Sequence, residues 1–233
     1  MKLRALTTTL TAAALLAFGA AAQASIVYSI STSSGLASMV IDPISDPQSA
    51  AEYYKYSFDG AASGNPDFGP VDDTAFFWLY DENDTGVLSL GMIFDKRNPD
   101  GDPPGGGTMN LTTSGMPGGT LISVGDDPGE VTTLVNGTEN WRWNDRNSDG
   151  GMVSGLEGTT WTIDILFNSF TGLDGGFNFV SGAAGGTFTA LNGIAAGETL
   201  TITATEVPEP ATLLLLGIGL LGFALKLRGR LSS

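Results

Sequence analysis

One segment of the sequence has oxygen-bearing side chains at the spacing of metal ligands. Asp145, Asn147 and Asp149 alternate along the chain, and a glycine follows directly. This matches the first half of an EF-hand-type calcium loop, in which alternating oxygen ligands converge on one ion and glycine permits a sharp turn. The second half departs from the pattern, because position 12 is Leu156 and the nearest carboxylate, Glu157, comes one residue late. Calcium is therefore a candidate ligand, and a plain turn rich in Asp and Asn is the alternative.

Two tryptophans, Trp141 and Trp143, come immediately before this segment. On a β-strand their indoles would share one face, with Arg142 on the other. An exposed indole pair would offer a platform for sugar rings, which favours a carbohydrate-binding module for exopolysaccharide, with calcium as a candidate helper. Aromatic residues at this spacing are also typical of a buried core. The sequence leaves both interpretations open.

Several kinds of catalysis are excluded within this chain because it contains no cysteine and no histidine. It cannot form a Ser-His-Asp triad, a cysteine nucleophile or a histidine-bearing zinc site. Acidic pairs such as Asp72-Asp73 and Asp126-Asp127 offer carboxyl groups, but glycoside hydrolysis needs two carboxyls at a set separation across a cleft. Neighbours on a turn do not provide that separation. We therefore predict a protein that is not an enzyme, and a secreted glycan-active enzyme is the third hypothesis.

A stripe of threonines occupies one face of a predicted strand near the end of the chain. Its members are Thr199, Thr201, Thr203 and Thr205. A flat array of several such rows could order water as ice-binding surfaces do. The sequence shows one row and no repeat to stack it, so the preference of threonine for β-strands is the better explanation.

The elements that position these residues are predicted to be β-strands. Apolar residues alternate in short runs separated by Gly, Asn, Asp and Pro, which indicates an all-β domain, an antiparallel sandwich or jelly-roll-like fold. In the segment 159–167, Trp161, Ile163, Ile165 and Phe167 should face the core. The other predicted strands are 25–32, 52–58, 74–80, 87–94, 120–124, 130–135, 177–180, 187–191 and 199–207.

The N-terminus has the three parts of a secretory signal peptide. Lys2 and Arg4 give a charged region, residues 6–17 are apolar, and Ala22 and Ala24 frame a cleavage site of the A-x-A kind. The mature chain is predicted to begin at Ser25. Residues 25–206 then form one extracytoplasmic domain, which is long enough to bury a core of its own.

The C-terminal segment contains Val207, Pro208, Glu209 and Pro210, then the uncharged run 211–225, then Lys226, Arg228 and Arg230. The two prolines predict an exposed, non-helical stretch. The run 211–225 predicts an apolar transmembrane helix of roughly 22 Å, which is shorter than a hydrocarbon core of about 30 Å. The cations after it predict a cytoplasmic C-terminus.

This segment, residues 207–233, resembles the PEP-CTERM sorting signal of Gram-negative bacteria. The resemblance implies that an exosortase, a membrane enzyme, recognises the motif and cleaves near it. It further implies an inner-membrane stage through residues 211–225, followed by a cell-surface or extracellular location in an exopolysaccharide context. We therefore expect an exported, non-catalytic surface or extracellular-matrix protein.

The charge of the chain separates the two ends from the middle. Five of the ten cations lie in the terminal segments, whereas all 25 acids lie between Asp42 and Glu209, so residues 25–210 carry a formal charge of −20 from five cations and 25 acids. Such a surface repels nucleic acid and anionic lipid. Neither is therefore expected as a partner of the domain.

Overall fold

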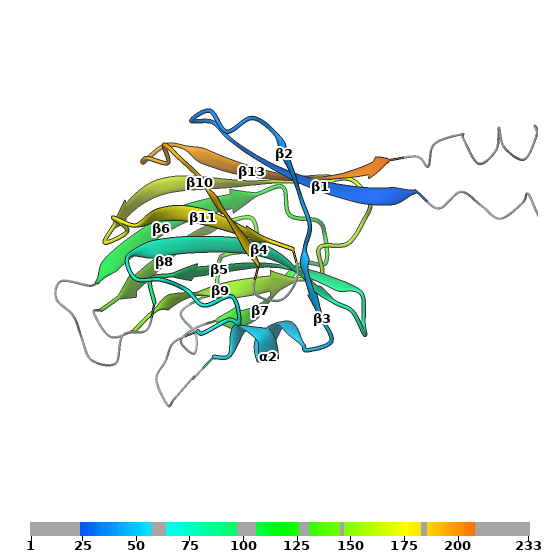
Figure 1. The fold of residues 1–233 in the computed structure, drawn as a ribbon, viewed down its shortest axis with the longest axis horizontal. Helices are drawn as coiled ribbons and strands as arrows, with labels where there is room; N and C mark the ends of the chain where they lie inside the picture. Colours follow the sequence, from blue (N-terminus) through cyan, green and yellow to red (C-terminus); the bar gives the residue numbers. More distant parts are fainter. Residues whose placement is uncertain are drawn as a thin grey trace, which may run out of the picture. The chain divides into compact units, whose positions relative to one another are not determined.

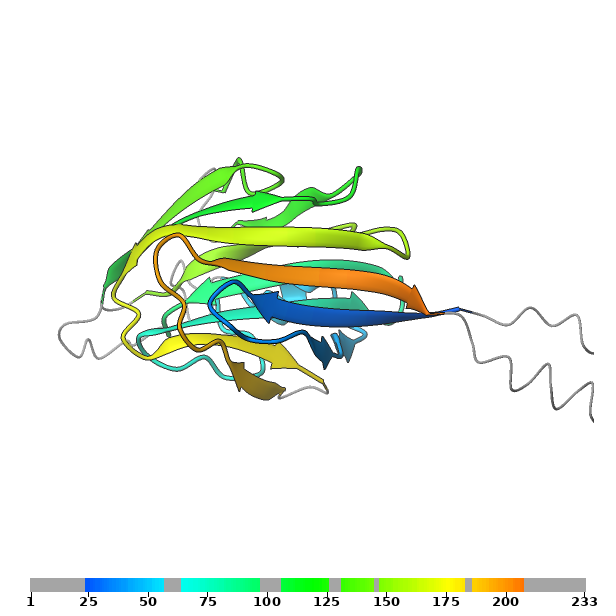
Figure 2. The ribbon, with the colours of Figure 1, turned by 90° about the horizontal axis from the view of Figure 1, so that it is seen from above.

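The computed structural model describes residues 24–56, 64–96, 106–125, 131–144, 147–182 and 186–207. Residues 26–205 form one compact unit, and residues 1–25 together with 206–233 are assigned to another. Within the first unit two β-sheets pack face to face (Figures 1 and 2), which confirms the predicted all-β fold. The predicted hydrophobic part of the signal peptide and the predicted helix 211–225 lie outside the described residues.

Sheet A has six strands in the order β2-β1-β13-β10-β6-β8. Its long central strand β10 pairs antiparallel with β13 on one side and with β6 on the other. The first and last strands of the domain, β1 and β13, are neighbours in this sheet. The bounds are β1 (Ser25–Thr32), β2 (Met39–Ile41), β6 (Gly107–Ser114), β8 (Thr138–Trp143), β10 (Trp161–Thr171) and β13 (Thr199–Val207).

Sheet B has seven strands, with the order β12-β11-β4-β5-β9-β7 and with β3 also pairing with β4. Strand β4 forms the predicted antiparallel hairpin with β5, but it pairs in parallel with β11 and with β3, so the sheet is mixed. The bounds are β3 (Ile44–Asp46), β4 (Thr74–Glu82), β5 (Val87–Phe94), β7 (Leu121–Gly125), β9 (Asp149–Ser154), β11 (Gly176–Ser181) and β12 (Thr187–Ala190).

The main core lies between the two sheets and follows from alternation along the strands. In β10 the residues predicted to face the core, Trp161, Ile163, Ile165 and Phe167, are all buried. In β13 Leu200, Ile202 and Ala204 are fully buried, and the threonines between them are not. Each strand of this kind buries one face and leaves the other to solvent.

A second, smaller core lies on the outer face of sheet B. Side chains from β4 pack there against the short helix α2 (Ala50–Tyr54) and the segment around Phe68. Figure 1 shows α2 beside β7 and β9, with which it makes contacts, on the side of sheet B away from sheet A. The members are Ile44, Ala50, Tyr53, Tyr54, Phe68, Phe76, Trp78, Tyr80, Ile93, Val124, Met152 and Val180.

The prediction of a strand over residues 52–58 is wrong where the structure describes the chain. Ser49 caps a helix instead: its hydroxyl accepts a hydrogen bond from the backbone N–H of Glu52, whose side chain accepts one from the N–H of Ser49 in return. This capping box satisfies two amide groups that would otherwise lack partners. The aromatic residues Tyr53 and Tyr54, which suggested a strand, are the buried face of this one-and-a-half-turn helix.

The prediction of a strand over residues 130–135 is also wrong in the described part, residues 131–135, because a buried carboxylate binds the backbone there. Glu139 is buried, and its Oε2 accepts hydrogen bonds from the backbone N–H groups of Thr132 and Thr133 at 2.8 and 2.7 Å. These donors are therefore not available to a sheet. Strand β9 lies beside β7 in the place that the predicted hairpin would have filled.

Candidate functional site

The two tryptophans that suggested a sugar platform are buried between the sheets. Trp141 is 2% exposed and Trp143 is 4% exposed, and both rings pack against Phe94 with centroid distances of 5.1 and 5.8 Å. As predicted for a strand, they share one face of β8, and Arg142 on the opposite face is exposed. Indoles in this position present no open ring face to a sugar, so the structure favours the core interpretation.

The segment that suggested calcium binding forms the connection between β8 and β9. Asp149 is 4% exposed, and its carboxylate accepts hydrogen bonds from the backbone N–H groups of Arg142 at 2.8 Å and Gly150 at 2.7 Å. It therefore ties the end of β8 to the start of β9. Asn147 is half-buried, and Asp145 lies outside the described residues. Calcium binding at this segment stays a prediction.

Within the described ranges, no group of three or more acidic side chains is arranged to hold a metal ion. The acidic pair Asp72-Asp73 lies beside the buried carboxyl group of Asp95, whose Oδ1 accepts hydrogen bonds from the N–H groups of Asp73 and Lys96. Burial raises the pKa of Asp95 above its ordinary value, these hydrogen bonds lower it, and the charges of Asp73 and Asp72 raise it further. Its role is to hold the turn before β4 against the end of β5. The pair Asp126-Asp127 lies outside the described residues.

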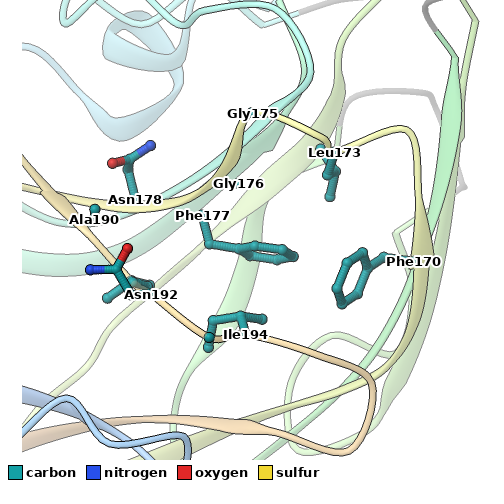
Figure 3. Close-up of a pocket in the computed structure, with 11 residues that line it drawn as sticks. Phe170, Leu173, Gly175, Gly176, Phe177, Asn178, Ala190, Asn192 and Ile194 are labelled. Carbon is teal, nitrogen blue, oxygen red and sulfur yellow. The ribbon is translucent and has the colours of Figure 1, made fainter.

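An open pocket of about 220 Å³ lies where the β10–β11 connection meets the segment after β12. Figure 3 shows the rings of Phe170 and Phe177 turned toward one another, with Ile194 beside them. The remaining lining residues are Leu173, Gly175, Gly176, Asn178, Ala190, Leu191, Asn192 and Gly193. None of the lining side chains is ionisable, so this pocket offers no general acid, general base or charged nucleophile.

The two ends of the domain coincide with the predicted processing signals. Strand β1 begins at Ser25, the predicted first residue of the mature chain, and Ala24 before it is exposed, whereas Ala22 lies outside the described residues. Strand β13 ends at Val207, and Pro208 to Pro210 and the three cations from Lys226 onward lie outside them. No helix in the described ranges is long and apolar enough to span a membrane.

The comparison with protein families decides what the C-terminal segment is. Residues 206–230 match the family model described as the PEP-CTERM protein-sorting motif. The chain carries a PEP-CTERM sorting motif. The match confirms the resemblance, and it covers the C-terminal segment only. No curated protein and no solved structure shows significant similarity to the chain.

The PEP-CTERM motif indicates a protein that is exported in the Gram-negative manner and sorted by an exosortase. The match begins at Glu206, one residue before the end of β13. Thr205, Glu206 and Val207 are exposed, and the pairing of β13 with β10 ends at Ala204. In sequence, therefore, the sorting motif follows the folded domain without a linker.

The polar rows on the outer face of sheet A were not predicted from the sequence. The threonine stripe of β13 was recognised, but the rows on the neighbouring strands were not. The signal was present in the segment Thr108-Met109-Asn110-Leu111-Thr112, where polar and apolar residues alternate as they do in β13. In the structure this segment belongs to β6, and Thr108, Asn110 and Thr112 lie on the same face as the stripe.

Proposed function

We propose that residues 25–206 form a non-catalytic domain of the cell surface or extracellular matrix, and that an exosortase-like enzyme releases or relinks it. The observation that carries this proposal is the PEP-CTERM match at residues 206–230, which starts inside the last strand of the domain. Because no linker separates the motif from the sandwich, the sandwich itself would be the domain that is exported and sorted. Before processing, residues 211–225 would hold the chain in the inner membrane, with Lys226, Arg228 and Arg230 in the cytoplasm.

A non-catalytic role is supported by the chemistry of the described surface. The pocket at the β10–β11 connection has no ionisable lining residue, and the buried carboxylates of Glu139 and Asp149 are bound to backbone N–H groups. Groups held in this way stabilise loops and are poorly placed to transfer protons to a substrate.

The mass of the mature protein tests this proposal. In cells with an exosortase we expect a product shortened near Pro208, with or without an attached group, and in cells lacking the enzyme a chain that keeps residues 208–233. Replacing Pro208, Glu209 and Pro210 by alanine should reproduce the unprocessed mass. The matched control is Ser232→Ala with Ser233→Ala, which lies beyond the matched residues and should leave processing unchanged. An identical mass with and without the enzyme would overturn the proposal.

A second candidate function is a carbohydrate-binding module for exopolysaccharide, with residues 145–149 as a candidate calcium site. The hydroxyl-rich outer face of sheet A, which carries few charged side chains, favours it, because it offers many hydrogen-bonding groups to solvent.

The calcium part has its own test, in which the melting temperature is compared with calcium and with a chelator. A ligand that binds only the folded state raises this temperature. Asp145→Ala should abolish the calcium-dependent rise, whereas the control Asp174→Ala, an exposed acid elsewhere, should retain it. Asp149→Ala is a poor probe because it also breaks two backbone contacts. An unchanged melting temperature on adding calcium would exclude the site.

A further inference from the structure

We infer that the outer face of four strands of sheet A, β13, β10, β6 and β8, is a docking surface for an uncharged polysaccharide chain. We call this surface the polar face; it consists of the outward-pointing residues of β13, β10, β6 and β8. The inference rests on the second candidate function, and it assigns that function to a surface unconnected with the buried pair Trp141 and Trp143. Its residues are Thr108, Asn110, Thr112, Ser114, Thr138, Asn140, Arg142, Thr162, Asp164, Leu166, Asn168, Ser169, Thr171, Thr199, Thr201, Thr203 and Thr205.

The polar face is built from rows that cross several strands. The registers place Thr138, Thr112, Leu166 and Thr199 in one row, and Ser114, Asp164 and Thr201 in the next. Further rows contain Asn140, Asn110 and Ser169, and then Arg142, Thr108 and Thr171. Neighbouring strands are about 4.8 Å apart and outward residues on one strand recur at roughly 6.8 Å, so the rows form a two-dimensional array of hydrogen-bonding groups.

Hydrogen bonds between strands hold these side chains in place. The hydroxyls of Thr112 and Thr138 are 2.7 Å apart, and the amide of Asn168 donates to Thr112 at 2.9 Å. The amide of Asn110 donates to Asn140. Each of these groups keeps a further donor or acceptor position, because a hydroxyl has one donor and two acceptor sites and an amide has two donors and two acceptor sites. Side chains that are already ordered lose less conformational entropy when a ligand binds.

The rows of the polar face carry almost no charge on a strongly acidic protein. Asp164 and Arg142 are their two ionisable residues, and the Asp164 carboxylate already accepts a hydrogen bond from Thr201 at 2.7 Å. Residues 25–210 as a whole have a formal charge of −20. This charge repels anionic polymers and further copies of the chain, and a face of hydroxyls and amides offers little apolar area to a protein partner. An uncharged polymer rich in hydroxyl groups matches both the local neutrality and the hydrogen-bonding groups.

Two details favour a flexible polymer over a rigid, regular surface such as ice. The register between β10 and β6 shifts between Phe167 and Ser169, which interrupts the regular spacing of the rows. Leu166 lies half-buried in the middle of the face, with threonines on both sides. An apolar centre surrounded by hydroxyls suits a sugar ring, which has C–H groups on its faces and hydroxyls at its edge.

The test is affinity electrophoresis of the mature protein from producing cells, in gels that contain one polysaccharide each. The neutral probes are dextran, a β-glucan and a galactomannan; alginate is the anionic probe and chitosan the cationic one. We expect at least one neutral polysaccharide to retard the protein and alginate to have no effect. Retardation by chitosan should disappear at high salt, because it depends on exposed charges.

The variant that tests the surface removes two cross-strand pairs, by Asn110→Ala, Asn140→Ala, Thr112→Val and Thr138→Val. Affinity for the neutral polysaccharide should fall at least tenfold, as expected from the loss of two or more hydrogen bonds. The matched control is Thr187→Val with Thr189→Val, on strand β12 of sheet B, and it should bind as the unmodified protein does. The melting temperature of each variant shows whether it is folded. If the four-residue variant unfolds, Thr201→Val with Thr203→Val provides a second test on β13.

Two results would overturn the inference: no retardation by any neutral polysaccharide, or equal retardation of folded four-residue and control variants. Mass analysis of the same preparations separates this failure from failure of the sorting proposal. An exosortase-dependent mass without polysaccharide binding would support the sorting proposal and contradict the proposal that the polar face binds a glycan.

Discussion

The outer faces of the two sheets differ in what they present. On sheet B the outward side chains of β4 are Phe76, Trp78 and Tyr80, and all three are fully buried beneath α2 and the segment around Phe68. On sheet A the outward side chains of β13 are threonines, which stay half-buried or exposed. One sheet is therefore a middle layer with a core on each side, and the other has a core on one side only. Of the two, only sheet A keeps the outward side chains of these strands accessible to a partner.

This difference can be read from the sequence by comparing two strands. Thr74 to Tyr80 includes five consecutive large apolar residues, Phe76 to Tyr80, without a polar residue between them, which is typical of a strand that is buried on both faces. Thr199 to Thr205 alternates strictly, as expected for a strand with one solvent-facing side. The length of an uninterrupted apolar run thus indicates which sheet another layer covers.

The largest expected effect of a single substitution is that of Trp78→Ala. The indole is fully buried and packs near Tyr54 and Phe68, with ring centroids 6.2 and 5.1 Å away. Its removal leaves a large cavity, so the free energy of unfolding should fall by about 3–5 kcal/mol. Leu166→Ala at the centre of the polar face is the comparison and should cost about 1 kcal/mol, because that side chain is only half-buried. Chemical denaturation measures both; equal losses would contradict the contrast between the faces.

Gly91→Ala should have the next largest effect. Gly91 pairs with Trp78 across β4 and β5, and a Cβ atom at this position would lie 2.2 Å from the indole ring. The indole or the backbone would have to move, which should cost about 1–3 kcal/mol. Gly118→Ala is the control, because its added Cβ would meet nothing within 4 Å and its backbone is not in the left-handed region. If both alanines leave the denaturation midpoint unchanged, the outer core of sheet B is looser than its geometry indicates.

The tyrosines of the covered face should make stability fall at alkaline pH. Burial and the neighbouring negative charges, led by Asp67 for Tyr53 and by Asp46 for Tyr80, raise both pKa values well above the ordinary value. A phenol with a raised pKa in the folded state contributes stability that is complete below its unfolded pKa, near 10, and lost as pH rises through that value toward the folded pKa. Phenolate absorbance from these two residues should therefore appear together with the unfolding signal.

Tyr80→Phe sharpens this prediction, because it removes the hydrogen bond that the Tyr80 hydroxyl donates to the carbonyl oxygen of Gln48 at 2.7 Å. Stability at neutral pH should fall by about 1 kcal/mol, and the remaining decline above pH 10 should become shallower. A phenolate spectrum that develops fully before any unfolding would show that the covered face admits solvent.

Local patterns and long-range contacts contributed differently to what the sequence could predict. Strand β13 was predicted with the bounds that the structure has, and β10 with the correct buried face, because polar and apolar residues alternate along both. Strand β1 was also predicted with its observed bounds. Helix α2 was missed because the aromatic residues Tyr53 and Tyr54 also fit a strand. That pattern outweighed the local helix signal of the capping box formed by Ser49 and Glu52. The loop at 131–135 could not be predicted, because the carboxylate that holds it, Glu139, is buried only once β8 is in place.

The candidate sites show the same limit. Trp141 and Trp143 were placed correctly on one face of a strand, but the sequence could not tell whether that face was inside. The polar face can be recognised only when the registers that align its four strands are known, and these strands are far apart in sequence. The threonine row of β13 alone was not enough to predict it.

The smallest expected effect is that of removing a hydroxyl from the polar face. Thr201→Val keeps the shape and β-propensity of the side chain but loses the hydrogen bond to Asp164, which is half-buried and can bind water instead. The free energy of unfolding should change by no more than about 0.5 kcal/mol. The comparison is Ser89→Ala within sheet B, which removes one member of a buried hydroxyl pair with Ser154 at 2.7 Å and should cost about 1–2 kcal/mol. A loss above 1 kcal/mol for Thr201→Val would mean that the threonines of the polar face serve the stability of the fold, and it would contradict their proposed role in binding a partner.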